Sequence, residues 1–192
     1  MNDFVLIYIG IILFFLFFIY IGNRNNDMEY IKSEVDKTDY LVRTLPDKKK
    51  AADLLAKTKK KLLELSYYLE KTYPKDKRVK RLSNFYNTVI VESQPKSKFT
   101  SFSINKGEKI VFCIRSRNSD EKLVNLNLLM FVAIHELAHV ITSSIGHTEE
   151  FWDNFKWLLV QAVKIKIYKP HDFQKKPEEY CGTTITDSPL QD

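Results

Sequence analysis

The chain has 192 residues, of which 44% are hydrophobic and 28% are charged, and its formal net charge is +6. These values allow one modest folded domain with a short appendage and exclude a wholly disordered chain. Two cysteines without a CxxC pair exclude a disulfide-rich framework. We interpret Cys113 and Cys181 as reduced thiols in a reducing compartment, although one bridge between them is compatible with the sequence.

The N-terminal segment, residues 4–22, reads FVLIYIGIILFFLFFIYIG and carries no charged side chain. As a helix it would span about 28 Å, close to the roughly 30 Å of a hydrocarbon core. It lacks the basic n-region and the small-residue cleavage site of a signal peptide. We therefore predict that residues 1–22 are an uncleaved, single-pass transmembrane anchor.

The orientation of this anchor follows from the flanking charges. No basic residue precedes the apolar run, whereas Arg24 and Lys32 follow it. The positive-inside tendency, together with unpaired cysteines, predicts a cytoplasmic C-terminal domain. Residues 23–46 are polar and mixed in charge, and we interpret them as a tether with some helix over residues 30–42.

A long helix is predicted from Asp47, a candidate N-cap, to about Glu70. Its helically spaced apolar residues are Ala51, Leu54, Leu55, Leu62, Leu65 and Leu69. Residues 48–81 also hold thirteen Lys or Arg against four Asp or Glu. A solvated helix face explains this charge, and anionic lipid or nucleic acid as a partner is the alternative.

Two short strands come next, residues 99–104 (FTSFSI) and 109–115 (KIVFCIR), with a turn at residues 105–108. This pattern predicts a β-hairpin. The second strand is either the edge strand that pairs with an extended peptide or an ordinary core strand. A long apolar helix then runs from about residue 124 to 143, a further helix follows the candidate cap Thr148, and the last twenty or so residues look irregular.

The motif HELAH occupies residues 135–139 of the apolar helix. His135 and His139 are four residues apart, so both imidazoles project from one face and can bind one ion. Glu136 is adjacent, where it can hold a zinc-bound water and take its proton as a general base. The motif therefore predicts a catalytic Zn²⁺ site with Glu136 as the catalytic residue.

A catalytic zinc needs a third protein ligand, and the helix cannot supply it. Residues 143–146 (SSIG) interrupt the helix and are followed at once by His147, which we predict as that ligand. The alternatives are the carboxylates Glu149, Glu150, Glu178 and Glu179, while His171 is interpreted as a surface residue. A metzincin needs a methionine-containing turn after its HExxH motif. All three methionines of this chain lie before the motif, so the metzincin class is excluded.

Tyr180 has two readings, as a hydroxyl donor to the tetrahedral intermediate or as a packing residue. A rival to the enzyme is a membrane-tethered structural or virion interaction protein with a non-catalytic zinc. Such a site would be closed by a fourth ligand, for which Cys113 or Cys181 is available.

HELAH followed by GHTEEFW resembles the WLM-type and SprT-like zinc metallopeptidases, and the chain is similar to uncharacterised WLM-like proteins of large double-stranded DNA viruses. The resemblance covers residues 39–190 through DYLVRTLPD, TSFSINKGEKIVFCIRS, FVAIHELAHVITSSIGHTEEFWDNFKWLL and YCGTTITDSPL. It implies an α+β, minimal zincin-like domain over residues 47–192 that hydrolyses a protein or peptide substrate. The predicted anchor would hold this domain at a virion or host membrane. It also implies zinc ligands His135, His139 and His147, with Glu136 as the base.

Overall fold

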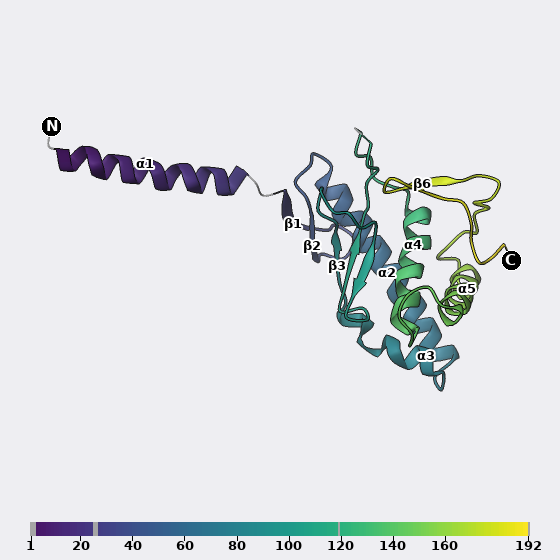
Figure 1. Cartoon of the computed structure of the whole chain (residues 1–192). Helices are drawn as coiled ribbons and strands as arrows, with labels where there is room; N and C mark the ends of the chain where they lie inside the picture. Colours follow the sequence, from purple (N-terminus) through teal and green to yellow (C-terminus); the bar gives the residue numbers. More distant parts are fainter. Residues whose placement is uncertain (1–2, 25–26, 119, 192) are drawn as a thin grey trace.

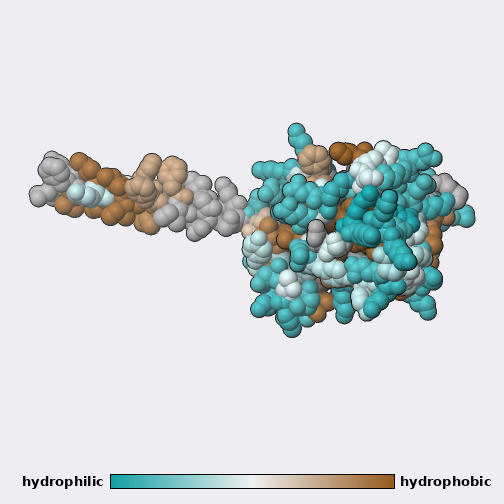
Figure 2. Space-filling view, turned by 90° about the horizontal axis from the view of Figure 1, so that it is seen from below, coloured by the Kyte–Doolittle hydropathy of each residue, from teal (hydrophilic) through white to brown (hydrophobic). Residues whose placement is uncertain are grey.

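The computed structural model describes residues 3–24, 27–118 and 120–191. Its first helix, α1 (Asp3–Arg24), extends away from the rest of the chain (Figure 1). Apolar side chains of Val5 and of residues 7–18 are exposed, and they form a brown surface beside a mostly hydrophilic domain in Figure 2. Among the described residues, no helix is found that is long and apolar enough to cross a membrane. The predicted helix is present, whereas the transmembrane anchor is not supported and stays a prediction.

A β-hairpin follows, made of β1 (Met28–Lys32) and β2 (Asp39–Arg43) in antiparallel register. The helix predicted over residues 30–42 is therefore wrong. Tyr40 and Val42 alternate with less buried neighbours, which is the two-residue period of a strand packed on one face. The carboxylate of Asp53 accepts hydrogen bonds from Ser33 Oγ (2.7 Å) and Glu34 N (2.8 Å), so the turn is held by the following helix.

That helix is α2 (Lys48–Thr72), which confirms the predicted element, and its buried stripe faces the core. Asp47 occupies the N-cap position but makes no capping hydrogen bond, because its carboxylate lies 2.8 Å from Arg115 instead. The short α3 (Lys77–Lys80) and the 3₁₀ helix η1 (Arg81–Asn87) then lead the chain toward the sheet.

The central sheet has three strands in the order β3 (Val89–Glu92), β5 (Lys109–Phe112) and β4 (Phe102–Ile104). β4 and β5 pair antiparallel, which confirms the predicted hairpin, and β3 pairs parallel to β5. β3 was not predicted from the sequence. Because β5 is the middle strand, β3 and β4 are the two edges of this sheet, and residues 109–115 are the core strand rather than the edge strand of the two readings.

Two helices complete the core, α4 (Leu126–Ile141) and α5 (Glu149–Lys164), as predicted. α4 is capped by Asn125, whose side chain accepts from Leu128 N (2.8 Å), and α5 by Thr148, which accepts from Phe151 N (3.4 Å). α4 contacts α2, α5 and β4, and most of its side chains are buried (Figure 1). The helix that carries the HELAH motif is thus held from several sides.

The C-terminal region contains one short hairpin, β6 (Glu178–Tyr180) and β7 (Thr183–Ile185), within otherwise irregular chain. Cys181 and Gly182 form its turn with positive φ values of 53° and 77°. Cys181 is joined to Cys113 by a disulfide. The interpretation of both cysteines as reduced thiols is therefore wrong. The sequence did not reveal the pair because the two residues are 68 apart and meet only in the folded chain. The cysteines consequently no longer support a cytoplasmic location for the domain.

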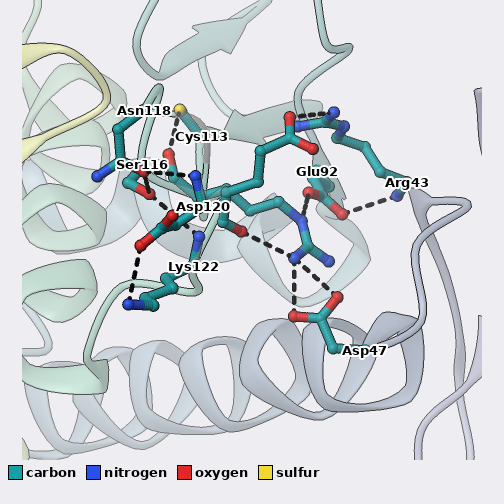
Figure 3. A network of polar contacts seen from close by, with 10 residues as sticks. Arg43, Asp47, Glu92, Cys113, Ser116, Asn118, Asp120 and Lys122 are labelled. Carbon is teal, nitrogen blue, oxygen red and sulfur yellow. Dashed lines mark hydrogen bonds and ion pairs between the residues drawn. The ribbon is translucent and has the colours of Figure 1, made fainter.

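A buried ionic network ties the N-terminal hairpin to the sheet and to α2 (Figure 3). Arg115, only 3% exposed, donates from Nε to Glu92 Oε1 (2.7 Å) and from Nη1 to Asp47 Oδ2 (2.8 Å). Glu92 also accepts from Arg43 N (2.7 Å). Burial raises the pKa of Glu92, and these hydrogen bonds oppose that rise.

Candidate metal centre

α4 supplies the first two histidines of the centre and the carboxylate between them. His135 and His139 lie one helical turn apart with ring centroids separated by 5.0 Å. Both are half-buried, whereas Glu136 is 4% exposed. The helix ends at Ile141 and is C-capped by Thr142, whose Oγ1 donates to Ala138 O (2.7 Å) and accepts from Asn154 Nδ2 of α5 (3.0 Å). The motif therefore sits at the end of a helix that is fastened to its neighbour.

The loop after α4 returns the chain so that His147 meets the other two histidines. His147 Nε2 lies 3.1 Å from His135 Nε2, and the ligand atoms of the three histidines are all within 4.8 Å of one another. Two nitrogens bound to one tetrahedral zinc at about 2.0–2.1 Å would lie about 3.3 Å apart. These three residues could hold a metal ion, as the sequence predicted.

The carboxylates considered as alternative ligands do not belong to the histidine group. Among the described residues, the group able to hold a metal consists of His135, His139 and His147. Glu150 accepts four hydrogen bonds from the loop: Ser143 N (3.0 Å), Ser143 Oγ (2.6 Å), Ser144 N (3.1 Å) and Ser144 Oγ (2.8 Å). These bonds lower its pKa to about 2. Glu150 thus positions the loop before His147 and is not part of the histidine group.

His171 also lies outside the histidine group. Its side chain is partly buried rather than fully on the surface, with Nε2 2.7 Å from Lys176 O and 3.5 Å from Glu178 Oε1. These two contacts give His171 and Glu178 a local role near the C-terminal hairpin.

An aromatic residue that sequence reasoning missed packs against all three imidazoles. The Phe151 ring stacks on His139 at 4.3 Å and meets His135 and His147 edge-on at 4.9 and 4.7 Å. Trp152 follows it, 5.7 Å from the His147 ring. The sequence does show two aromatic residues in the first turn of the helix after His147. Whether their rings face the histidines depends on how α5 packs, which the sequence does not show.

Burial sets the protonation states of the site. It lowers the pKa of His135 to about 3 and that of His139 to about 4, with neighbouring positive charge adding to the effect. Both imidazoles are therefore neutral at pH 7, which is the form that binds metal. Burial also raises the pKa of Glu136 to about 7, so this carboxylate exchanges protons near neutral pH.

The three histidines and Glu136 line a cavity of about 1010 Å³. One wall is β4 with its flanking residues, and another is the C-terminal segment from Tyr180 to Pro189. Tyr180 is 3% exposed, and its hydroxyl lies 2.7 Å from Ser101 Oγ. Burial raises the pKa of Tyr180, and the nearby Glu136 charge raises it further, so the phenol stays protonated. Tyr180 and Glu136 thus line the same cavity.

An α+β domain with an HExxH helix, a returning third histidine and a buried glutamate defines a domain of the metalloprotease type. The WLM domain model matches residues 33–191, so the chain belongs to the WLM family, a metalloprotease family. The predicted family resemblance is confirmed.

Relatives of this chain occur in large DNA viruses. An uncharacterised protein of Acanthamoeba polyphaga mimivirus is 33% identical over 198 residues, which covers 100% of both chains. An uncharacterised protein of Invertebrate iridescent virus 3 is 39% identical over 104 residues, covering 53% of this chain and 58% of that protein. Another, from Invertebrate iridescent virus 6, is 39% identical over 84 residues, covering 42% and 44%.

Among solved structures, a Wss1 mutant from Saccharomyces cerevisiae is similar with a TM-score of 0.51. The match covers 66% of this chain and 88% of that chain at 19% sequence identity. This likeness shows a shared fold, the α+β arrangement of helices around a small sheet.

Proposed function

We propose that this chain is a zinc-dependent peptidase in which Glu136 is the general base. The observation that carries the proposal is the convergence of three histidine ligand atoms within 4.8 Å beside a buried glutamate in one open cavity. Three imidazoles are a donor set that suits Zn²⁺ and leaves one position open. The bound ion would supply a Lewis acid and a water of lowered pKa.

The side chains of this chain then have separate roles. His135, His139 and His147 hold the ion, and Glu136 accepts a proton from the attacking water and passes it to the leaving amine. Burial raises the pKa of Glu136, and a bound cation would lower it again, so the carboxylate would be ionised and ready to accept the proton at neutral pH. The hydroxyl of Tyr180 donates a hydrogen bond to the developing oxyanion. The edge of β4 pairs with an extended peptide.

The rival proposal, a closed non-catalytic zinc site, needs a fourth protein ligand. Cys113 and Cys181 were the candidates, and their sulfur atoms are joined to each other. A disulfide sulfur cannot serve as a thiolate ligand. This observation favours the open, catalytic site.

The direct test compares the full-length protein with its Glu136→Gln variant. We expect the variant to keep one zinc per chain and to lose roughly 100- to 10,000-fold in peptide cleavage rate, the usual share of general base catalysis. Metal analysis and cleavage of a quenched fluorescent peptide library are the two measurements. Cleavage at an unchanged rate by the glutamine variant would contradict the mechanism.

The metal ligands are tested by His147→Ala with His171→Ala as its matched control. We expect the first substitution to weaken zinc binding strongly, because two imidazoles remain, and the second to leave zinc content unchanged. Competition with a chromogenic chelator measures both affinities. Full zinc affinity without His147 would mean that another group completes the site.

We also propose, from the sequence, that residues 4–22 attach the protein to a virion or host membrane. The exposed apolar side chains of α1 support this, and the orientation now rests on Arg24 and Lys32 alone. Replacing Leu13 and Phe17 together by arginine should abolish co-flotation of the full chain with lipid vesicles.

Binding of anionic lipid or nucleic acid to residues 48–81 stays a prediction. Comparing vesicles with and without anionic lipid tests whether these residues bind lipid.

A further inference from the structure

We propose that the Cys113–Cys181 disulfide is a thiol–disulfide exchange site that controls one wall of the cavity. In the oxidised protein the wall formed by residues 178–190 is held against the sheet, and reduction releases it together with Tyr180. The expected loss of cleavage on reduction rests on the proposed peptidase function, whereas the release of the wall does not.

The disulfide links two parts of the fold that are otherwise separate. Cys113 directly follows the central strand β5, and Cys181 lies in the turn between β6 and β7. Those two strands pair only with each other and form a two-stranded sheet of their own among the described residues. No backbone ladder therefore continues from the main sheet into this hairpin, and the S–S bond is its covalent link to β5.

The remaining polar contacts of the hairpin are few or long. Glu178 is reached by Asn125 Nδ2 at 3.4 Å and by His171 Nε2 at 3.5 Å. The strongest contact is the 2.7 Å pair between the hydroxyls of Tyr180 and Ser101. Tyr180 and Cys181 are also buried in the core, and Ile185 packs against it. Each of these contacts is weaker than a covalent bond, so the disulfide is the link that fixes the hairpin against β5.

A short path connects the disulfide with the catalytic side chains. Ser101 Oγ accepts a hydrogen bond from Cys113 N (3.1 Å) and pairs with the hydroxyl of Tyr180. Tyr180 precedes Cys181 in sequence and lines the cavity that Glu136 also lines. After Tyr180, Thr183, Ile185 and the residues 187–189 continue the same wall. Loosening the hairpin therefore removes both a hydroxyl donor and part of the peptide-binding surface.

A small reductant has a place from which to approach. Cys113 lines a second cavity of about 200 Å³, together with Arg43, Arg115 and Arg117. Two of the three arginines are neutralised in ion pairs, Arg115 with Glu92 and Arg43 with Glu121, so Arg117 supplies the positive charge of this cavity. Positive charge near a sulfur stabilises thiolates, both that of an attacking thiol and that of the cysteine released. The ligand class that fits this cavity is a small thiol, favoured where it carries negative charge.

The exchange is balanced in electrons and protons. The thiolate of a small dithiol attacks one sulfur of the pair, the S–S bond breaks, and a mixed disulfide forms with release of the other cysteine. The second thiol of the reductant then resolves that mixed disulfide. The dithiol is oxidised to its cyclic disulfide, and Cys113 and Cys181 take up two electrons and two protons and become thiols.

The test uses the full-length, zinc-loaded protein before and after dithiothreitol, with amide hydrogen exchange, zinc content and peptide cleavage measured on the same samples. We expect exchange in residues 178–190 to accelerate on the order of tenfold or more on reduction, while α4 stays protected and zinc stays bound. Cleavage should fall at least about tenfold and return on reoxidation. The Cys113→Ala/Cys181→Ala double variant should match the reduced protein and ignore the thiol.

The readouts separate the two proposals. Unchanged exchange of residues 178–190 on reduction, or a disulfide that the thiol does not reduce in the folded protein, would overturn the redox proposal whatever the cleavage rate. Faster exchange with no cleavage in either state would support the redox-controlled wall and reject the peptidase function. Faster exchange with an unchanged cleavage rate would overturn control of catalysis by this disulfide.

Discussion

The carboxylate of Glu150 accepts hydrogen bonds from the backbone and hydroxyl groups of Ser143 and Ser144, in the loop that brings His147 back toward α4. Lys106 holds the same loop from the other side, donating to Thr142 O (2.8 Å) and Ser144 O (3.1 Å). The position of the third histidine is therefore set by side chains that do not belong to the metal group. From the sequence, Glu150 was only an alternative ligand.

Glu150→Gln should change how the metal-free protein responds to acid. The folded-state pKa of Glu150 is about 2, below its ordinary value of 4.5. Its ionised form therefore stabilises the fold fully above pH 4.5, and this contribution is lost as the pH falls toward and through 2. The variant should be less stable at neutral pH and should lose less stability between pH 4.5 and 2.

Urea unfolding at a series of pH values measures this difference. The neighbouring Glu149→Gln variant is the matched control, because it removes the same charge from the first turn of α5 without touching the loop. Equal acid dependence in the Glu150→Gln variant and the unmodified protein would show that the four hydrogen bonds do not stabilise the fold.

Between elements, the turn of the β4–β5 hairpin packs directly on the helix that carries the metal ligands. Gly107 has a φ of 99°, and a Cβ added there would lie 2.8 Å from Val140 Cγ2. Position 107 therefore requires glycine for two reasons, the left-handed backbone conformation and the close approach of α4. Through this turn, the edge strand β4 and the histidines are held in one rigid arrangement.

Gly107→Ala should destabilise the protein by about 1–3 kcal/mol, from backbone strain together with overpacking against Val140. Adding Val140→Ala makes room for the new methyl group and should restore the part of the unfolding free energy that overpacking removed. The two substitutions should therefore be non-additive in a double-mutant cycle. Gly146→Ala is the control, since its φ is 85° and nothing lies within 4 Å of an added Cβ, leaving backbone strain alone. Strictly additive effects at positions 107 and 140 would contradict the predicted contact.

At the scale of the whole molecule, Arg115 unites segments that are distant in sequence. Its guanidinium meets Asp47 before α2 and Glu92 at the end of β3, and Glu92 in turn accepts from the backbone of Arg43 in β2. The N-terminal hairpin is thereby part of the folded unit, consistent with a family match that begins at residue 33.

Arg115→Met should cost about 3–5 kcal/mol of unfolding free energy, because it leaves the buried Glu92 carboxylate without its ion-pair partner. The Arg115→Met/Glu92→Leu double variant removes both charges and should be less destabilised than the single variant. Chemical denaturation of the three proteins measures the effect. A double variant that is less stable than Arg115→Met would show that the pair is not coupled in this way.

The features that the sequence determined by itself are those that depend on residues close together in the sequence. The i, i+4 spacing of His135 and His139, the Thr148 cap, the 105–108 turn and the apolar stripe of α2 are all local patterns, and local hydrogen bonds and helical periodicity suffice to read them. The same reasoning reached His147, because a broken helix followed at once by a ligand leaves the chain few ways to return.

Tertiary structure decided the features whose partners are far apart in the chain. The Cys113–Cys181 disulfide, the parallel pairing of β3 with β5, and the entry of Tyr180 into the cavity each join segments whose separation carries no periodic signal. The hairpin at residues 28–43 belongs here too, since its alternation has meaning only once α2 covers one face. Such contacts form because folding buries shared apolar surface, and that surface exists only in the assembled molecule.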